Sequence, residues 1–404
     1  MKILFLTQLF PYPPVCGGTI RSYNILRHLA ARHDVTLVSF VRKPLSEEQV
    51  RAGLELCRDM RTVPIRRSAA ANVRFAAASL ASRRPFIVAR DFVPAMQRTV
   101  GELAESGRFD LAYVDHLQMA QYLMSWRACP KVLDEHNVEW KVIQRIAARE
   151  RTPIKRLFAE IEWRKLRRWE ARACRSFDLV FTVTENDLRT LAADCPDLSS
   201  FVCIPIGVDF ERFPSVKLDP DSKDIVSIAT MSWPPNIDSI LYFASRVYPK
   251  IKERVDGVRL VIVGSSPPEA IRRLGKADES IEVAGFVPDL RVVASRTAAF
   301  IVPLRSGSGL RVKILNAMAM GLPIVSTSVG CEGIGAEPGR HLLVADGAAE
   351  FAEAVVRLLA DYDLRRRLAR GGSSFVRANY GWNTICSRLD AALDRLLQSA
   401  RSGI

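Results

Sequence analysis

FIVPLRSGSGLRVKILNAMAMGLPIVSTS, residues 300–328, has the pattern of a strand, a glycine turn, a helix and a second strand. Its apolar start leads into Gly307 and Gly309, residues 310–320 have helical spacing, and Gly321 ends the helix. Glycines before a helix let backbone N–H groups approach an anion, and the helix adds the positive end of its dipole. The stretch therefore predicts a β-α-β unit with a phosphate site.

Two cations, Arg311 and Lys313, lie in the first turn of this predicted helix. Positive side chains there oppose the helix dipole unless a negative group binds nearby or both side chains face solvent. Phosphate binding is the interpretation that we favour. A tight turn with two solvated cations is the alternative.

Length predicts about two domains, and composition predicts a soluble globular protein. The 404 residues are 48% hydrophobic and 25% charged, and the formal net charge of +14 favours anionic partners. The sequence contains no recognisable nucleic-acid module, so we expect no nucleic-acid partner. The start, MKILFLTQLFPYPPVCGG, is typical of a first strand and not of a signal peptide, and no apolar run approaches a membrane span. Eight cysteines without C-x-x-C spacing indicate reduced thiols in a cytoplasmic protein.

Strands and helices alternate along the whole chain, which is typical of parallel sheets. A loop-like stretch follows residue 206, and a new alternation begins at Ile225. We therefore expect an N-terminal domain at residues 1–206, a second domain at residues 207–380, and a terminal helix at 381–404 that packs back toward the first domain. Two such domains predict a cleft for a small ligand.

Histidines follow two predicted strands of the first domain. His116 follows the predicted strand DLAYVD (110–115), and His136 follows the predicted strand KVLD (131–134). Ligands gather outside the carboxyl ends of strands in open α/β sheets, so the pair favours a binding site. For either histidine alone, a polar residue satisfied by a neighbouring loop is an equal alternative. Three further polar residues share this region: Glu135, Asn137 and Glu139.

Residues 151–175 predict a long basic helix that also carries aromatic side chains. Such a helix can lie on an anionic bilayer, which would be the inner face of the membrane for a cytoplasmic protein. An ordinary amphipathic helix with a solvated basic face is the more frequent case, and both interpretations stay open.

Six motifs in order make the chain resemble a glycosyltransferase of family 4 from end to end. They are FLTQLFPYPPVCGGTIRSYNILRHLA (5–30), DEHNVEW (134–140), IPIGVDFERF (204–213), VGSSPPEAI (263–271), EVAGFVPDL (282–290) and GLRVKILNAMAMGLPIVSTSVGCEGI (309–334). The resemblance is strongest to bacterial enzymes of exopolysaccharide and surface-glycan synthesis. It implies the retaining GT-B fold, two Rossmann-like domains whose parallel sheets face each other across a cleft.

The resemblance also implies roles for individual positions. The N-terminal glycine loop, near donor phosphate and acceptor, matches Gly17 and Gly18. The histidine that faces the transferred sugar is matched best by His136, with His116 second. The remaining donor-binding positions are those that read the nucleotide base, Phe286 and Val287, and those that begin the helix facing the diphosphate, Gly309 and Leu310.

Two glutamates of the common family pattern are replaced here by Ser308 and Asn316. Asn316 can still hydrogen-bond ribose hydroxyls, but without a charge. Many relatives also carry an arginine and a lysine after the first strand of the second domain, where this chain has neither. Arg311 and Lys313 are the cations expected to replace them.

The family activity implied is transfer of a sugar from a nucleotide diphosphate sugar to a glycan or polyprenyl-linked acceptor, with retention and without a cofactor or metal. Arg311, Lys313 and His136 are the expected catalytic groups. An inactive glycosyltransferase-like subunit that binds a nucleotide sugar or a partner enzyme is one alternative, prompted by Ser308 and Asn316. A nucleotide-sugar epimerase is another, and its acid and base would have to be Glu135 and Glu139.

Overall fold

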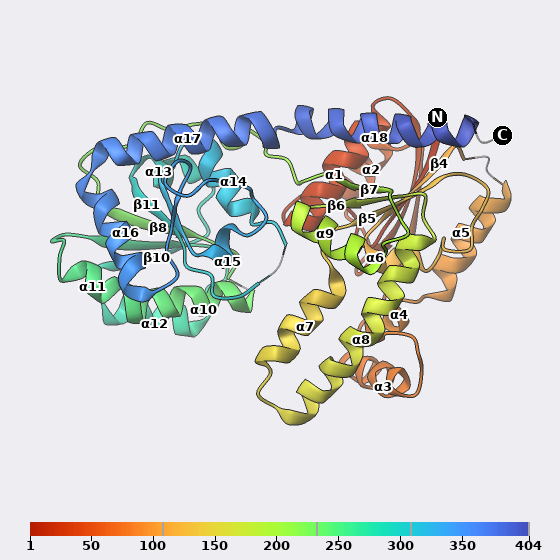
Figure 1. Ribbon diagram of the computed structural model, residues 1–404, viewed down its shortest axis with the longest axis horizontal. Coiled ribbons are helices and arrows are strands. Elements are labelled where there is room, and N and C mark those ends of the chain that lie inside the picture. The colour runs from red at the N-terminus through yellow and green to blue at the C-terminus, as the bar shows by residue number, and fades with distance from the viewer. Residues whose placement is uncertain (107–108, 232, 308, 403–404) are drawn as a thin grey trace. The chain divides into compact units, whose positions relative to one another are not determined.

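The computed structural model describes residues 1–106, 109–231, 233–307 and 309–402. Contacts between residues divide the chain into two compact units. The first unit is Met1–Ile206 together with Cys386–Ile404, and the second is Gly207–Ile385. Each unit is built around one parallel sheet with helices packed on it (Figure 1).

The first unit has a seven-stranded sheet in the order β3-β2-β1-β4-β5-β6-β7. Its strands are nearly continuous apolar runs because both faces of a parallel sheet are covered. The strand order reverses between the neighbours β1 and β4, which is where ligands bind in open α/β sheets. The strands are β1 (Lys2–Thr7), β2 (Asp34–Val41), β3 (Asp59–Pro64), β4 (Leu111–Asp115), β5 (Lys131–Glu135), β6 (Leu179–Thr182) and β7 (Phe201–Cys203).

Nine helices of the first unit precede β7 among its described residues, and α7 and α8 form an antiparallel hairpin (Figure 1). The terminal helix α18 (Trp382–Ser402) joins this unit from Cys386 onward, where Asp390 pairs with His28 at 2.7 Å and with Arg32 at 2.5 Å. The nine helices are α1 (Gly17–Ala30), α2 (Glu47–Leu56), α3 (Ala69–Leu80), α4 (Phe86–Arg90), α5 (Pro94–Ser106), α6 (Leu117–Ala120), α7 (Glu139–Arg149), α8 (Pro153–Arg175) and α9 (Glu185–Asp194).

The second unit has a six-stranded parallel sheet in the order β10-β9-β8-β11-β12-β13, which reverses between β8 and β11. Figure 1 shows α10, α11 and α12 on one side of this sheet and α13, α14 and α17 on the other. Separate apolar clusters fill the two sides. The strands are β8 (Asp224–Ile228), β9 (Arg259–Val263), β10 (Ile281–Gly285), β11 (Thr297–Val302), β12 (Ile324–Ser326) and β13 (Leu343–Val344).

The helices of the second unit alternate with its strands. A π-helical stretch, Phe243–Val247, joins the first two of them. They are α10 (Pro234–Tyr242), α11 (Tyr248–Lys252), α12 (Glu269–Ala277), α13 (Leu290–Ser295), α14 (Val312–Ala319), α15 (Ser328–Cys331), α16 (Ala348–Ala360) and α17 (Tyr362–Tyr380).

The predicted strand, turn, helix and strand at residues 300–328 are present as β11, α14 and β12. The helix begins later than predicted, because Arg311 has a non-helical backbone (φ −86°, ψ 81°) and is the N-cap residue. Arg311 therefore precedes the helix, and only Lys313 lies in its first turn. Helix α7 was not predicted, since the polar residues at its start resemble a strand-end loop.

In the part of the chain that the structure describes, every helix is too short or too polar to cross a bilayer.

Candidate active site

The switch point of the first sheet brings two polar strand ends together. Thr7 at the end of β1 lies opposite Asp115 at the end of β4 in the strand register. The Thr7 hydroxyl donates to Asp115 Oδ2 at 2.5 Å. The carboxylate of Asp115 is fully buried, so each of its contacts is shielded from water.

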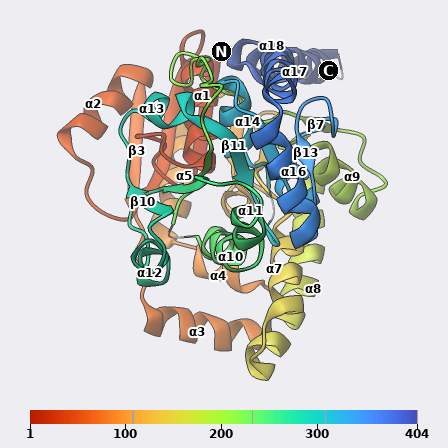
Figure 2. The ribbon, with the colours of Figure 1, turned by 90° about the vertical axis from the view of Figure 1, so that its left-hand side faces the viewer.

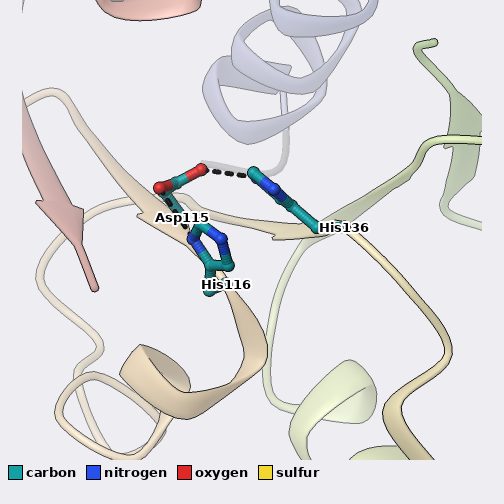
Figure 3. Close-up of side chains that lie close together, drawn as sticks. All are labelled: Asp115, His116 and His136. Atoms are coloured by element: carbon teal, nitrogen blue, oxygen red, sulfur yellow. Dashed lines mark hydrogen bonds and ion pairs between the residues drawn. The ribbon is translucent and has the colours of Figure 1, made fainter. Parts of the chain in front are cut away.

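Asp115 is the centre of a hydrogen-bond network that orients two histidines (Figure 3). Its Oδ2 accepts from Ser22 Oγ at 2.8 Å and from His116 Nδ1 at 2.9 Å. Its Oδ1 accepts from His136 Nε2 at 2.7 Å. The two imidazole rings stack with their centroids 3.7 Å apart. One carboxylate from β4 therefore positions both histidines that the sequence singled out.

The network shifts the pKa values of the two histidines in opposite directions. Burial by itself would raise the pKa of Asp115, but His116 and His136 lower it well below its ordinary value. Burial opposes a charge on His116, yet Asp115 raises the pKa of this histidine. Burial and the neighbouring His116 lower the pKa of His136. A neutral His136 that donates from Nε2 to Asp115 keeps its Nδ1 as an acceptor.

The outer nitrogens of both histidines face the start of α1. A Cβ atom at Gly18 would lie 3.5 Å from His116 Nε2 and 3.7 Å from His136 Nδ1. Residues 17–20 include no acidic residue, so the positive end of the α1 dipole is not neutralised locally. This place combines a donor, an acceptor and a helix N-terminus, which suits a ligand that has both hydroxyl groups and negative charge.

Asp115, His116 and His136 are close enough together to be metal ligands, with one ligand atom from each within 4.8 Å of the others. The nitrogen of each ring that faces Asp115 is already hydrogen-bonded to it. An ion in the middle of the trio would have to break both bonds. The arrangement fits Asp115 as a positioning residue for two imidazoles better than it fits a cation site.

A second buried network, centred on Asp134, fixes α1 to β5. Arg21 on α1 makes hydrogen bonds of 2.7–3.0 Å to both carboxylate oxygens, and Tyr113 Oη donates to Oδ2 at 2.7 Å. Arg21 also donates to the carbonyls of Ile204 and Pro205. The residue before Glu135 and His136 is therefore held rigidly, which limits how far the histidine can move.

Glu135 belongs to a different environment from the histidine pair. Side chains alternate along a strand, and Glu135 faces away from Asp134, toward α8. It is 1% exposed, and neither of its oxygens has a hydrogen-bond partner among the described residues. Burial, then the charges of Glu170 and Glu139, raise the pKa of Glu135 well above its ordinary value. Its burial among carboxylates therefore favours the protonated form of Glu135.

Glu139 and Asn137 lie nearer to the histidines than Glu135 does. Burial raises the pKa of Glu139, while His116 and hydrogen bonds from Gln118 and Asn137 partly oppose this shift. The N-terminus of α7 is capped by Glu170, which accepts from the backbone N–H groups of Glu139 at 2.9 Å and Trp140 at 3.0 Å. Glu139 and Asn137 thus surround His116 on a capped helix start.

The switch point of the second sheet brings together the starts of α10 and α14. Lys313 Nζ on α14 donates to Asn236 Oδ1 on α10 at 3.0 Å. Asn236 Nδ2 in turn donates to the Thr230 carbonyl at 2.9 Å, in the loop after β8. Asn236 is not among the site residues predicted from the sequence, although its place directly after the two prolines of SWPPN is typical of a helix start.

Arg311 is packed into the glycine turn that precedes α14. It is 5% exposed, and its guanidinium donates to the Gly309 carbonyl and to the Val329 carbonyl, the latter at 3.4 Å. Gly307 has φ 137° and Gly309 has φ 75°, values that favour glycine. A Cβ atom at Gly307 would lie 2.9 Å from Trp233. The turn therefore needs glycine to hold Arg311 where it is.

Lys313 and Arg311 form a pair of neighbouring cations. Burial, then the positive charge of Arg311, lower the pKa of Lys313 to about 7. The first turn of α14, residues 312–315, contains no acidic residue. Two cations held together at a helix N-terminus are an arrangement that a bound phosphate would stabilise.

The other predicted donor residues are also in the second unit, except for the glycines of α1. Phe286 follows Gly285 after β10 and is 72% exposed, whereas Val287 packs against the core. Leu310 packs against the same core, and Asn316 is partly exposed on α14. Ser308 lies outside the described residues.

Comparison with known families assigns the chain to a class. The family described as "Glycosyltransferase Family 4" matches residues 15–212, and "Glycosyl transferases group 1" matches residues 222–361. The chain belongs to the family 4 glycosyltransferases, and its two Rossmann-like domains are those of the GT-B fold.

Two relatives illustrate the range of the family. An uncharacterized 44.6 kDa protein in the cps region of Klebsiella pneumoniae is 22% identical over 403 residues, which are 96% of this chain and 98% of the relative. A GDP-mannose-dependent alpha-(1-6)-phosphatidylinositol monomannoside mannosyltransferase of Mycobacterium tuberculosis is 28% identical over 235 residues. That match spans 52% of this chain and 60% of the relative.

Solved structures share the fold at low identity. Sucrose-phosphate synthase from Thermosynechococcus elongatus superposes with a TM-score of 0.69 at 16% identity, over 99% of this chain and 100% of the other. The Anabaena protein HepE in complex with UDP and glucose gives a TM-score of 0.67 at 15% identity, over 98% and 100% of the two chains.

Proposed function

We propose that this protein transfers a sugar from a nucleotide diphosphate sugar to a hydroxyl group of a glycan or polyprenyl-linked acceptor, with retention at the anomeric carbon. The observation that carries the proposal is the cation pair Arg311 and Lys313 at the start of α14, at the switch point of the second sheet. The solved complexes of HepE with UDP support a nucleotide diphosphate donor. The cps-region relative supports a role in surface-glycan synthesis.

The second unit is the proposed donor side. The bond between the anomeric carbon and the β-phosphate oxygen breaks, and the diphosphate leaves with the electron pair. Cations and N–H groups already aimed at the leaving group stabilise the charge that develops on it. Arg311, Lys313 and the N–H groups of the Gly309 turn are these donors. Ser308 and Asn316 are nearby in sequence, and Phe286 and Val287 are the proposed contacts of the nucleotide base.

The first unit is the proposed acceptor side. His136, positioned by Asp115, orients the transferred sugar, with His116 as its neighbour and Gly17 and Gly18 leaving room for the ligand. The acceptor oxygen forms the new bond to the anomeric carbon, and its proton passes to the departing phosphate. Because the phosphate takes the proton, the reaction needs no side chain as a general base. Glu135, which faces away from the histidines, is therefore not given this role.

A direct test is a screen of UDP-, GDP-, ADP- and dTDP-sugars by thermal shift, followed by a transfer assay with the donor that binds. The anomeric coupling of the product by NMR reports the stereochemistry. Retention supports the proposal, and an inverted product rejects it. An isomerised donor would instead identify an epimerase.

An inactive nucleotide-sugar-binding subunit is the second candidate function. The observation that favours it is the replacement of the two family glutamates by Ser308 and Asn316. Calorimetric binding of a donor without transfer or hydrolysis would support this function. If the protein is such a subunit, Asn316→Glu, which restores one carboxylate, should still be inactive. If the protein is a working enzyme, the native chain should turn over without this substitution.

The proposed acceptor determines where in the cell the enzyme must work. A polyprenyl-linked acceptor is confined to a bilayer, so an enzyme that uses one must reach the inner face of the membrane. The basic helix α8 is the element that we propose for peripheral contact.

A further inference from the structure

Helix α3 is an apolar helix in which seven of the twelve residues are exposed, four are half-buried and one is buried. Its sequence, AAANVRFAAASL, contains one charged residue. The structure describes all of α3, and only Ser79 in it is buried. Val73 is 70% exposed and Leu80 is 55% exposed. Helices of about 12 residues are marginal in water without packing, so α3 needs a partner for its apolar surface.

The last turn of α3 is fastened to α8. Ser79 Oγ donates to Glu162 Oε1 at 2.6 Å, and Lys165 Nζ donates to the Ser79 carbonyl at 2.7 Å. Glu162 Oε2 also accepts from Phe86 N at 2.6 Å. These bonds hold α3 beside the hairpin of α7 and α8 while leaving its apolar side chains exposed.

The tip of the α7–α8 hairpin exposes further apolar side chains. Ile154 is 81% exposed, Leu157 62%, Ile146 52% and Ile161 37%. Among the described residues, twelve large apolar side chains are exposed, and six of them lie on α3, α7 and α8. Figure 1 and Figure 2 show α3 and the hairpin tip projecting on the same side of the first unit. We call α3 together with residues 146–161 the projecting surface.

The projecting surface carries a net positive charge. Its α3 part has one cation, Arg74, and no acidic residue. Residues 146–161 contain four cations and two acids: Arg149, Arg151, Lys155 and Arg156, with Glu150 and Glu160. Three of these arginines, Arg149, Arg151 and Arg156, line a shallow hollow at the hairpin tip together with Leu157.

We propose that the projecting surface docks on an anionic phospholipid bilayer, with its apolar side chains in the interface and its arginines on the headgroup phosphates. Exposed aliphatic side chains surrounded by cations are the chemistry that such a bilayer binds. The inference names the surface and the lipid class for the peripheral contact, and it rests on the proposed use of a polyprenyl-linked acceptor. It extends the contact beyond α8 to α3, which is apolar and has Arg74 as its single charged residue.

The test is flotation of the whole protein with vesicles of phosphatidylglycerol and phosphatidylethanolamine, against vesicles of phosphatidylcholine. Ile154→Ser with Leu157→Ser should weaken binding about tenfold or more by removing inserted side chains. Val50→Ser with Leu54→Ser is the matched control, because both residues are exposed on α2 of the same unit. The control should bind like the native protein.

The charge is tested separately. Arg151→Gln, Lys155→Gln and Arg156→Gln together should lower affinity for the anionic vesicles about a hundredfold, since cations near the surface act almost additively. Arg42→Gln with Lys43→Gln, two exposed cations elsewhere in this unit, is the control that should change little. The same triple variant should keep its donor hydrolysis, which separates loss of docking from loss of the proposed activity.

Three outcomes would overturn the proposal. They are equal binding to both kinds of vesicle, control variants that lose binding as much as the test variants, and a dimer in lipid-free solution that Val73→Ser or Leu80→Ser dissociates. The dimer would mean that a second copy covers α3. Bilayer binding without sugar transfer would leave the docking inference standing and reject only the catalytic proposal.

Discussion

Asp115 is the residue on which the histidine pair depends. Four elements meet at its carboxylate: β1 through Thr7, α1 through Ser22, the end of β4 through His116, and the end of β5 through His136. An amide in place of the Asp115 carboxylate would keep the shape of the side chain but remove its charge. Since an amide group cannot accept hydrogen bonds from every one of these donors, the two imidazole rings would lose their fixed orientations.

Asp115→Asn should therefore lower turnover about a hundredfold or more, a size typical of a displaced acid–base or orienting group. It should also lower the pKa of His116, since Asp115 is what raises it. Steady-state kinetics and histidine NMR titration are the measurements. Asp110→Asn, at the opposite end of the same strand, is the control. A variant with native turnover and an unchanged His116 titration would contradict the positioning role.

Lys313 should make binding of the proposed donor depend on pH. Its pKa of about 7 means that its ammonium group loses its proton as pH rises through 7. Affinity for the nucleotide diphosphate should be highest below pH 7 and should fall by up to about tenfold per pH unit above it, until the pKa of the complex is reached.

Calorimetric titration with UDP and GDP between pH 6 and 9 measures this decline. Lys313→Arg is the informative variant, because its guanidinium stays charged over the whole range. Its affinity should stay level with pH. An equal decline in the variant would show that another group titrates.

At the scale of elements, the turn between β11 and α14 shapes the proposed donor site. Its backbone enters regions that favour glycine, and Trp233 from the start of α10 packs against it. Helix α14 starts at Val312, so Arg311 can fold back on the Gly309 carbonyl while Lys313 points to α10. The helices α10 and α14, which follow the neighbouring strands β8 and β11, thus both contact the pair Arg311 and Lys313.

Gly307→Ala should strain this turn, because alanine at φ 137° would also place its Cβ 2.9 Å from Trp233. We expect a cost of about 1–3 kcal/mol in the free energy of unfolding and weaker donor binding. Denaturant unfolding and calorimetry measure the two effects. Gly257→Ala is the control: it has φ 70°, but no described atom lies within 4 Å of the added Cβ. Equal losses of donor binding in both variants would refute the local explanation.

At the scale of the whole molecule, α18 belongs to both units. It starts at Trp382 in the second unit, and from Cys386 it is part of the first. Leu389 is fully buried, and Asp390 pairs with His28 and Arg32 on or beside α1. The end of the chain therefore contributes to the stability of the domain that holds the histidine pair.

Leu389→Ala should lower the free energy of unfolding of the first unit by about 2–4 kcal/mol, the usual cost of a buried cavity. Scanning calorimetry should show one transition shifted down, and hydrogen exchange should show lost protection in α1. Arg395→Ala, an exposed position on the same helix, is the control. If only amides of the second unit lost protection, the assignment of α18 to the first unit would be contradicted.

Much of the architecture was accessible from local pattern. Buried strands of a parallel sheet are apolar on both faces, so alternation of apolar runs with helical periods indicated both sheets, and Gly307, Gly309 and Gly321 marked the β11–α14–β12 unit. The same local logic placed His116 and His136 at strand ends. It did not identify Asn236 as a partner of Lys313, because their contact joins positions 77 residues apart.

The sequence by itself determined the class of the fold and the family, since strand and helix periods and the glycine positions depend on neighbouring residues only. The tertiary structure decided which side chains act together. It joined Thr7, Ser22 and the two histidines on Asp115, turned Glu135 away into a buried acid pair with Glu170, and left α3 exposed. These are properties of long-range packing and burial, which shift protonation and expose surfaces in ways that no local pattern encodes.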